Sequence, residues 1–304
     1  MKPRAFRSFA KINLGLEVQG QLPGGYHELK TIFATVSLHD IVEIEETTRG
    51  ISVRSDHPGV PEDETNIAWR AAALMQKIAG RRRGVRITLH KHIAPGGGLG
   101  GGSSNAATVL RALDRIWELD LPKPRLVEAA KSLGADVPYF LVGGPALGLG
   151  RGDLIQPLGL RLADRVLLVQ GKGGVSTAAV FRQFAERAGK NPRRRRSPID
   201  MFVQGLGGVS SLRNDLEPAA IGVSPDLGRV AREVRRVGRA TGATTAAMSG
   251  SGSSFFLLFE GAAQRVAAGR LLEKAGVETL PCAFLSRRAF RERFEIPRPL
   301  PKRR

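Results

Sequence analysis

The order of apolar and polar positions along the first half of the chain predicts strands interspersed with helices. Apolar residues alternate over 6–18, and β-branched residues recur at every second position over 30–38 and 40–46, which predicts strands there. Helical spacing of apolar residues predicts helices over 63–80, 103–119 and 124–134, with another strand over 84–93. The first of these helices is expected to start at a capping residue, Thr65 or Asn66, and to stop at Gly80.

The second half continues the same mixture, with no internal repeat. It is expected to open with a strand over 164–170 and to hold helices over 175–189, 226–242 and 262–276. A glycine-serine loop runs into a strand within 246–261, a last strand covers 281–288, and the chain from Ile296 on is expected to fray. The order lacks the regular strand–helix alternation of a doubly wound parallel sheet. We therefore predict an α+β fold, with two layered sheets, helices on one face and a cleft between the sheets.

Composition adds a strong positive charge. The chain has 304 residues, 42% of them hydrophobic, and a formal net charge of +19 with a pI near 11.2, which favours anionic partners. Arginine-rich runs at 81–83, 191–198, 232–236 and 301–304 carry part of this charge. They lack interleaved aromatic residues and any nucleic-acid-binding signature, so we interpret them as solvated loops and tails. A nucleic-acid-binding protein is the alternative from another functional class.

Cellular location is also constrained by the sequence. The N-terminal residues lack an uninterrupted apolar segment of the kind found in signal peptides, and the longest uncharged stretch, 137–150, is too short to span a bilayer. The single cysteine, Cys282, excludes an internal disulfide and a multi-cysteine metal site. We expect a cytoplasmic protein with no membrane partner.

One short segment carries the main chemical signal. IAPGGGLGGGSSNAATVL, at 93–110, has six glycines in seven positions between a predicted strand and a predicted helix. Each ordered glycine costs about 0.5–1 kcal/mol relative to alanine, and the free N–H groups of a helix N-terminus attract phosphate. The P-loop sequence G-x-x-x-x-G-K-[ST] is absent, and the match to the dinucleotide fingerprint is weak. The segment therefore predicts a phosphate-binding loop of another kind.

This loop resembles the phosphate loop of the GHMP kinases, which include galactokinase and the homoserine, mevalonate and phosphomevalonate kinases. Further motifs follow in the order that the family has. They are AKINLGL (10–16), GYHEL (25–29), TNIAWRAA (65–72), PGGGLGGGSSNAA (95–107), LGADVPYF (133–140), NDLEP (214–218) and MSGSGSSFF (248–256). The resemblance covers roughly residues 8–290.

The resemblance implies a two-domain fold and a small-molecule kinase activity. An ATP-binding domain resembling ribosomal protein S5 domain 2 would span 1–162 and a ferredoxin-like domain 163–295, with a basic tail over 296–304 and the active site between the domains. The doubled glycine motif is similar to the branch that phosphorylates a cytidine-diphosphate-linked alcohol for isoprenoid precursors. A homoserine or mevalonate type is the alternative within the family. A monomer or homodimer without specific nucleic-acid binding is expected.

Two residues are expected to carry the catalysis. Taken alone, Lys11 could be a surface charge and Asp136 a helix cap. However, Lys11 lies in a strand that is otherwise apolar, and Asp136 lies at a constrained bend before Pro138. Buried charges need partners, and a Lys11–Asp136 pair would satisfy both. By resemblance, Asp136 is the general base that takes the proton of the acceptor hydroxyl, while Lys11 keeps that carboxylate ionised and aligns the hydroxyl.

The resemblance also implies how the two substrates bind. ATP, with Mg²⁺ shielding its phosphates by ligands that cannot be identified from the sequence, would be held by Ala94, Pro95, Gly96, Gly97, Gly98, Leu99, Gly100, Gly101, Gly102, Ser103 and Ser104, with Asn66 near the adenosine. Tyr26 would stack on cytosine, His27 would hydrogen-bond its edge, and Asn13 would contact the acceptor hydroxyls. Thr177 and Phe181 match further acceptor positions, and for Phe181 a plain helix-core position beside Val180 and Phe184 is the alternative.

Overall fold

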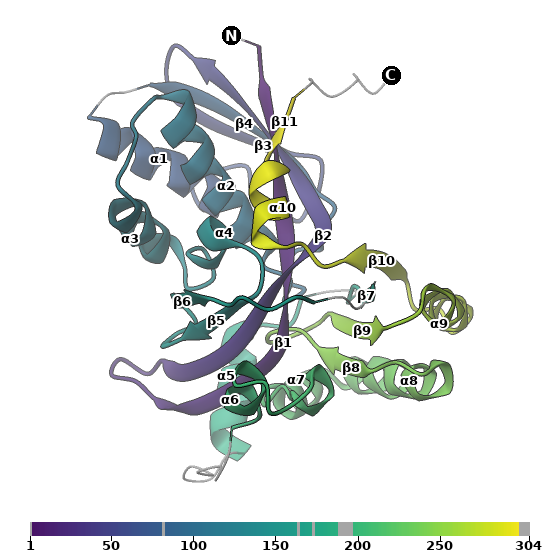
Figure 1. Cartoon of the computed structure of the whole chain (residues 1–304). Coiled ribbons are helices and arrows are strands. Elements are labelled where there is room, and N and C mark those ends of the chain that lie inside the picture. Colours follow the sequence, from purple (N-terminus) through teal and green to yellow (C-terminus); the bar gives the residue numbers. More distant parts are fainter. Residues whose placement is uncertain (1, 81–82, 163–164, 172–173, 188–196, 298–304) are drawn as a thin grey trace.

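The computed structural model describes residues 2–80, 83–162, 165–171, 174–187 and 197–297 (Figure 1). Most of the arginine run 191–198 and the end of the predicted basic tail lie outside these residues. The first half contains β1 (Arg4–Gln21), β2 (His27–Thr47), β3 (Ile51–Ser55), α1 (Ile67–Ala79), β4 (Gly84–His90), α2 (Gly101–Ile116), α3 (Lys123–Leu133), α4 (Tyr139–Val142), β5 (Ala146–Leu149) and β6 (Leu154–Pro157).

In the second half, none of the described strands is longer than five residues. Its elements are β7 (Arg165–Val169), α5 (Thr177–Arg187), α6 (Pro198–Val203), the 3-10 turn η1 (Val209–Ser211), α7 (Glu217–Val223), α8 (Pro225–Thr241), β8 (Thr245–Met248), β9 (Phe255–Phe259), α9 (Ala262–Lys274), β10 (Thr279–Ala283), α10 (Arg287–Glu292) and β11 (Glu295–Ile296). No helix among the described residues is both long and apolar enough to cross a membrane.

The strands form two sheets, which confirms the predicted α+β class. A seven-stranded sheet has the order β11-β1-β2-β4-β3, with β5 and β6 extending from β2, and a four-stranded sheet has the order β10-β7-β9-β8. The long antiparallel β1–β2 pair runs through the centre of the molecule (Figure 1). The two strands predicted over 30–46 are one continuous strand, β2, because register shifts in its pairing with β1 absorb the break in alternation.

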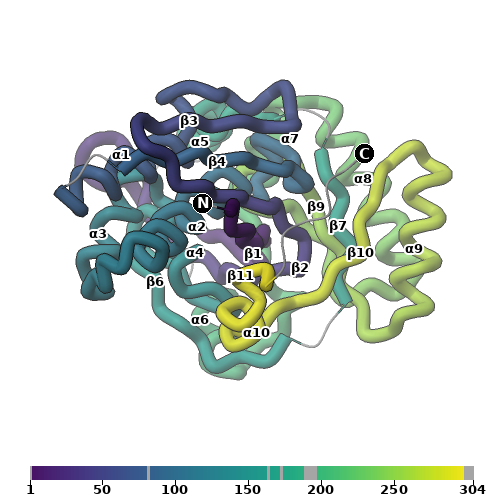
Figure 2. The backbone as a smooth tube through the Cα atoms, turned by 90° about the horizontal axis from the view of Figure 1, so that it is seen from above, coloured from purple at the N-terminus to yellow at the C-terminus, as the bar shows by residue number. Residues whose placement is uncertain are grey.

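Helices cover the outer face of each sheet, and apolar residues fill the space between the sheets. Ile12 and Leu14 of β1 share a buried cluster with Val166 and Leu168 of β7 and with Phe256 of β9. Alternate residues of β7 and β9 face the other way, toward α8 and α9. Seen from above, α1 and α3 lie at one side and α8 and α9 at the other, with the strands between them (Figure 2). The predicted single helical layer is therefore two layers.

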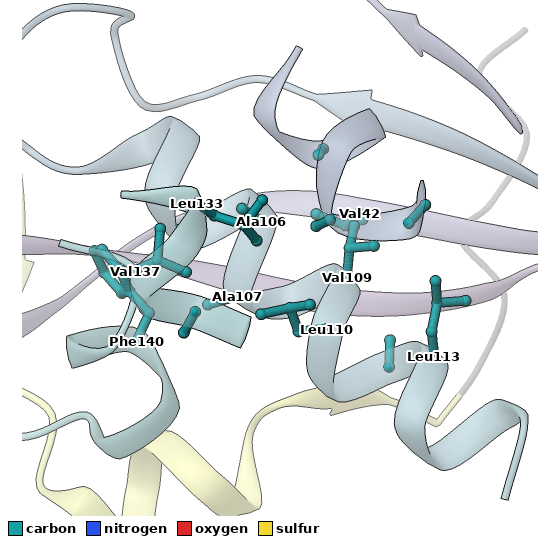
Figure 3. Close-up of a cluster of buried hydrophobic side chains, with 14 of the residues drawn as sticks. Val42, Ala106, Ala107, Val109, Leu110, Leu113, Leu133, Val137 and Phe140 are labelled. Carbon is teal, nitrogen blue, oxygen red and sulfur yellow. The ribbon is translucent and has the colours of Figure 1, made fainter. Parts of the chain in front are cut away.

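Helix α2 is held on several sides by apolar contacts. Its residues Val109, Leu110 and Leu113 are fully buried in one cluster with Val42 of β2, and Figure 3 shows Val109 beside Val42. Toward the N-terminus of the helix, Ala106 and Ala107 lie near Leu133, Val137 and Phe140 (Figure 3). This packing fixes the direction of the helix that follows the glycine loop.

The C-terminal segment differs from the prediction. Ile296, which we expected to fray, lies in β11 and pairs with Ala5 of β1. Helix α10 packs through Phe290 onto Phe9 of β1. The predicted second domain, 163–295, therefore includes a segment that returns to the first sheet, because its apolar side chains find their partners there.

Candidate active site

The glycine loop joins β4 to α2 in a tightly folded conformation. Gly96, Gly98 and Gly100 have φ values of 71°, 75° and 72°, in the left-handed region that side chains disfavour. A Cβ atom on Gly98 would lie 2.4 Å from the carbonyl oxygen of Ser249, and one on Gly100 would lie 2.7 Å from the Phe140 ring. The sequence suggested that glycine lets a ligand approach; the structure adds that glycine lets protein approach too.

A second glycine loop, residues 249–254 between β8 and β9, braces the first one. The Ser254 backbone N–H donates to the Gly97 carbonyl at 3.0 Å, and the Ser249 hydroxyl donates to the Gly98 carbonyl at 3.0 Å. Asn214 in turn donates to the carbonyls of Met248 and Gly250 at 2.9 and 2.7 Å. The conformation of the glycine loop therefore depends on residues near the other end of the chain.

The predicted pair of Lys11 and Asp136 is formed. The Lys11 Nζ atom lies 3.2 Å from Asp136 Oδ2, and its side chain is 4% exposed while that of Asp136 is 34% exposed. Lys11 Nζ also donates to Asn13 Oδ1 at 2.6 Å, and Asn13 Nδ2 donates to Thr31 Oγ1 at 2.8 Å. The lysine charge is thus buried against a carboxylate that still reaches the adjoining cavity.

This cavity, of about 480 Å³, brings most of the predicted residues together. Its lining includes Lys11, Asn13, Ala94, Pro95, Gly96, Gly97, Gly98, Gly100, Gly101, Gly102, Ser103, Asp136, Thr177 and Phe181. The N-terminus of α2 opens onto this cavity. The backbone N–H groups of the first helical turn, which have no partner within the helix, and the positive end of the helix dipole therefore lie beside Lys11. Such a cavity favours an anionic ligand, and we call it the reaction cavity.

Three predicted nucleotide residues do not line the reaction cavity. Leu99 is fully buried in the core between the sheets. The Ser104 hydroxyl, expected to be available to the nucleotide, donates to the Phe9 carbonyl at 2.7 Å because Ser104 lies on the buried side of α2. Asn66 caps α1, with Oδ1 accepting from the Ala68 N–H at 2.8 Å and Nδ2 donating to the Pro61 carbonyl at 2.6 Å, so its amide is occupied by the chain itself.

The residues predicted to hold a flat base line a second cavity of about 850 Å³, which we call the aromatic cavity. Tyr26, in the turn between β1 and β2, is 57% exposed. The rings of His27 and Phe181 are stacked, with centroids 5.0 Å apart and an interplanar angle of 23°. Phe181 is therefore more than a core residue: Val180 is fully buried, whereas Phe181 is partly exposed and lines both cavities.

Two further details describe the aromatic cavity. Burial lowers the pKa of His27, which favours the neutral imidazole with its one donor and one acceptor. The Thr177 hydroxyl lies 2.8 Å from the Ser251 hydroxyl, at the point where α5 begins. Thr177 therefore joins the second glycine loop to the aromatic cavity.

A buried polar network behind α2 was missed by the sequence analysis. Asp40 is fully buried and accepts hydrogen bonds from Lys91 Nζ, from Asn105 Nδ2 and from the backbone N–H groups of His92 and Ile93. It thereby holds the end of β4, where the glycine loop begins. The available signal was weak, since Asp40 stands at the start of one predicted strand and Lys91 near the end of another.

Replacing Asp40 with alanine is expected to lower the free energy of unfolding by about 3–5 kcal/mol, because the buried Lys91 ammonium loses its carboxylate. Chemical denaturation of the purified protein measures the change. The matched control is Glu45→Ala, which removes a carboxylate from a surface pair with Arg86 and should cost at most about 1 kcal/mol. Equal losses in the two variants would contradict the role assigned to Asp40.

Among the described residues, no group of three or more His, Cys, Asp or Glu side chains is placed to hold a metal ion. A protein-only metal cage of that kind is therefore missing from the described part of the chain. A cation that enters with phosphate groups needs fewer protein ligands.

Comparison with known proteins places these features in one family. The models of the GHMP kinases N terminal domain and of the GHMP kinases C terminal match residues 66–144 and 206–272. The 4-diphosphocytidyl-2-C-methyl-D-erythritol kinase of Chlorobium chlorochromatii is 38% identical over 91% of this chain and 93% of its own length. The enzyme of the same name from Thiobacillus denitrificans is 42% identical, covering 84% of this chain and 86% of its own.

Solved structures agree with the sequence relatives. A crystal structure of 4-(cytidine 5'-diphospho)-2C-methyl-D-erythritol kinase has a TM-score of 0.74 at 35% identity and covers 92% of this chain and 98% of that one. A homoserine kinase from Cytophaga hutchinsonii has a TM-score of 0.68 at 17% identity, covering 92% of this chain and 94% of its own, which shows a shared fold alone.

Proposed function

Since the chain belongs to the GHMP kinases, and its relatives of 36–42% identity are 4-diphosphocytidyl-2-C-methyl-D-erythritol kinases, we propose that it carries out their reaction. It transfers the γ-phosphate of ATP to the 2-hydroxyl of 4-diphosphocytidyl-2-C-methyl-D-erythritol, giving the 2-phosphate and ADP, in isoprenoid precursor biosynthesis. The observation that carries the proposal is the joining of two cavities: one holds the glycine loop and Asp136, and the other holds His27 stacked on Phe181.

The proposed roles on the nucleotide side follow from charge and backbone geometry. The triphosphate lies along the glycine loop and the N-terminus of α2, where backbone N–H groups and the helix dipole favour negative charge. Mg²⁺ prefers oxygen ligands and keeps several waters, and the Ser103 hydroxyl is an oxygen donor that fits such an ion. When bound, the ion neutralises charge on the phosphates.

The proposed roles on the acceptor side centre on Asp136. The acceptor hydroxyl oxygen bonds to the γ-phosphorus, the bond from that phosphorus to the ADP oxygen breaks, and the hydroxyl proton passes to the Asp136 carboxylate. Lys11, 3.2 Å from that carboxylate, and Asn13, bonded to Lys11, hold it in place and orient the hydroxyl. Phosphoryl transfer depends mainly on such positioning and charge neutralisation.

An assay of ADP release with Mg-ATP tests the reaction directly. It compares 4-diphosphocytidyl-2-C-methyl-D-erythritol with homoserine and with mevalonate at equal concentrations. Turnover with the cytidyl acceptor alone is expected. Turnover of homoserine or mevalonate instead would overturn the proposed acceptor while leaving the family membership intact.

The exposed ring of Tyr26 gives a prediction for the acceptor alone. Tyr26→Ala is expected to raise the KM for the cytidyl acceptor by about 5–150-fold, because stacking contributes about 1–3 kcal/mol per base. Tyr26→Phe keeps the ring and should stay near the wild-type KM. Steady-state kinetics with each substrate varied in turn measures both values, and a matching rise in the KM for ATP would contradict the assignment.

We further propose a cytoplasmic location and a monomeric or homodimeric state. The single Cys282 is a free, buried thiol, which is compatible with a reducing compartment. Light scattering on the purified protein measures its mass against that of the 32.7 kDa chain.

A further inference from the structure

The passage between the two cavities contains one charged side chain. The reaction cavity and the aromatic cavity share Leu29, Ala135, Arg151, Thr177 and Phe181 in their linings, and of these Arg151 alone is charged. An acceptor whose base lies in the aromatic cavity and whose hydroxyl reaches Asp136 must cross this passage. The group between its base-ribose end and its methylerythritol end is a diphosphate, so two negative charges would lie near Arg151.

Arg151 is held in place by a short turn between β5 and β6. Gly150 and Gly152 on either side of it have φ values of 67° and 90°, and the Leu29 N–H donates to the Gly150 carbonyl at 2.6 Å. That bond fixes the turn to the start of β2, two residues after His27. The guanidinium carbon lies 5.1 Å from the centroid of the Tyr26 ring, at the edge of the aromatic cavity.

The guanidinium has donors to spare. Its Nη2 atom lies 3.3 Å from Asp153 Oδ2, and the side chain is 38% exposed. A single carboxylate contact on one nitrogen does not use the five N–H donors of a guanidinium, whose fork matches the oxygens of a phosphate. Since Asp136 and Asp153 are both acidic, a diphosphate without a cation here would meet repulsion from both.

Resting on the proposed function, we propose that Arg151 binds the diphosphate of the acceptor and thereby selects nucleotide-linked alcohols over free ones. Tyr26 and His27 recognise the base, and Arg151 recognises the group that separates the base from the reacting hydroxyl. The protein would then contact the acceptor at three points, namely the base, the diphosphate and the reacting hydroxyl, rather than at the base and the hydroxyl alone.

The test compares ligands that differ only in the diphosphate. For Arg151→Gln, the KM for the cytidyl acceptor and the dissociation constant of CDP should rise about 10–100-fold, while cytidine affinity and the KM for ATP stay within about twofold. Arg151→Lys keeps the charge but loses the forked guanidinium, so its KM for the cytidyl acceptor and its dissociation constant for CDP should lie between those of the wild type and of Arg151→Gln. Calorimetric titration with CDP and with cytidine supplies a readout that is independent of turnover.

A control variant tests whether the effect is specific to Arg151, and different results would contradict the inference and the proposed function. Arg86→Gln removes an arginine that is 54% exposed and pairs with Glu45 outside both cavities, and it should leave all four constants unchanged. If CDP and cytidine lose the same affinity in Arg151→Gln, the arginine acts by supporting the Tyr26 ring, and the inference is wrong; it is also wrong if neither changes. If the wild-type protein itself neither binds CDP nor turns over the cytidyl acceptor, the proposed function fails first.

Discussion

Replacement of Asp136 by asparagine is expected to lower kcat by about 10²–10⁴-fold while ATP still binds. Asparagine has nearly the same shape, but its amide cannot take the proton of the acceptor hydroxyl. It also leaves the buried Lys11 ammonium facing a neutral group at the 3.2 Å contact. The glycine loop and the N-terminus of α2 are untouched, so the nucleotide site persists. Single-turnover kinetics measures the chemical step, and calorimetry measures ATP affinity.

A matched control uses a lysine–aspartate pair that lies away from the reacting groups. Asp200→Asn removes the carboxylate that pairs with Lys30 at 2.8 Å, on the surface and outside both cavities. This variant should keep its turnover, and thermal unfolding of both variants shows whether the fold is intact. Turnover within tenfold of wild type in Asp136→Asn would contradict the proposed role as general base.

Replacement of Gly98 by alanine is expected to lower activity by about 10²-fold or more, although the change adds one methyl group. The new Cβ would stand 2.4 Å from the Ser249 carbonyl oxygen, and the backbone at φ 75° would be strained as well. The two glycine loops must then separate, which moves the phosphates away from Asp136. A displacement of about 1 Å can cost about 10²-fold in rate. The KM for ATP and kcat should both change.

Gly102→Ala is the control for this variant, with stability as its readout. Gly102 lies in the first turn of α2, and its nearest neighbour to an added Cβ is 3.6 Å away. Alanine there should leave the melting temperature equal or higher, whereas Gly98→Ala should lower it. If both variants melt like the wild type and Gly98→Ala stays active, the packing of the two loops is less restrictive than we infer.

Local features of the fold could be predicted because they depend on neighbouring residues. Asn66 and Gly80 bound α1 as expected, since a side-chain cap and a left-handed glycine act within one helical turn. The pairing of Lys11 with Asp136 was also predictable, because a lysine within an apolar strand requires a nearby carboxylate. The family resemblance implied that Tyr26, His27 and Phe181 share one site, and in the structure all three line one cavity.

The remaining features depend on contacts between residues far apart in the chain. The Asp40 network links β2, β4 and α2, and the polarity of Asp40 alone does not reveal which buried donors surround it. The strands β5 and β6 have four residues each, which is too few to show the alternation of apolar and polar residues. The turn that carries Arg151 could therefore not be predicted from the sequence. The same holds for β11, whose two residues are strand only because β1 offers an unpaired edge.

The bracing of one glycine loop by the other has a consequence for synthesis of the protein. Residues 249–254, which hold Gly97 and Gly98 in place, leave the ribosome long after the glycine loop itself, and β11 leaves later still. A nascent chain that ends after α5 already contains Lys11, Asp136 and the phosphate loop, but it lacks the contacts that shape them. We therefore expect the kinase to become competent only when nearly all of its chain has been made.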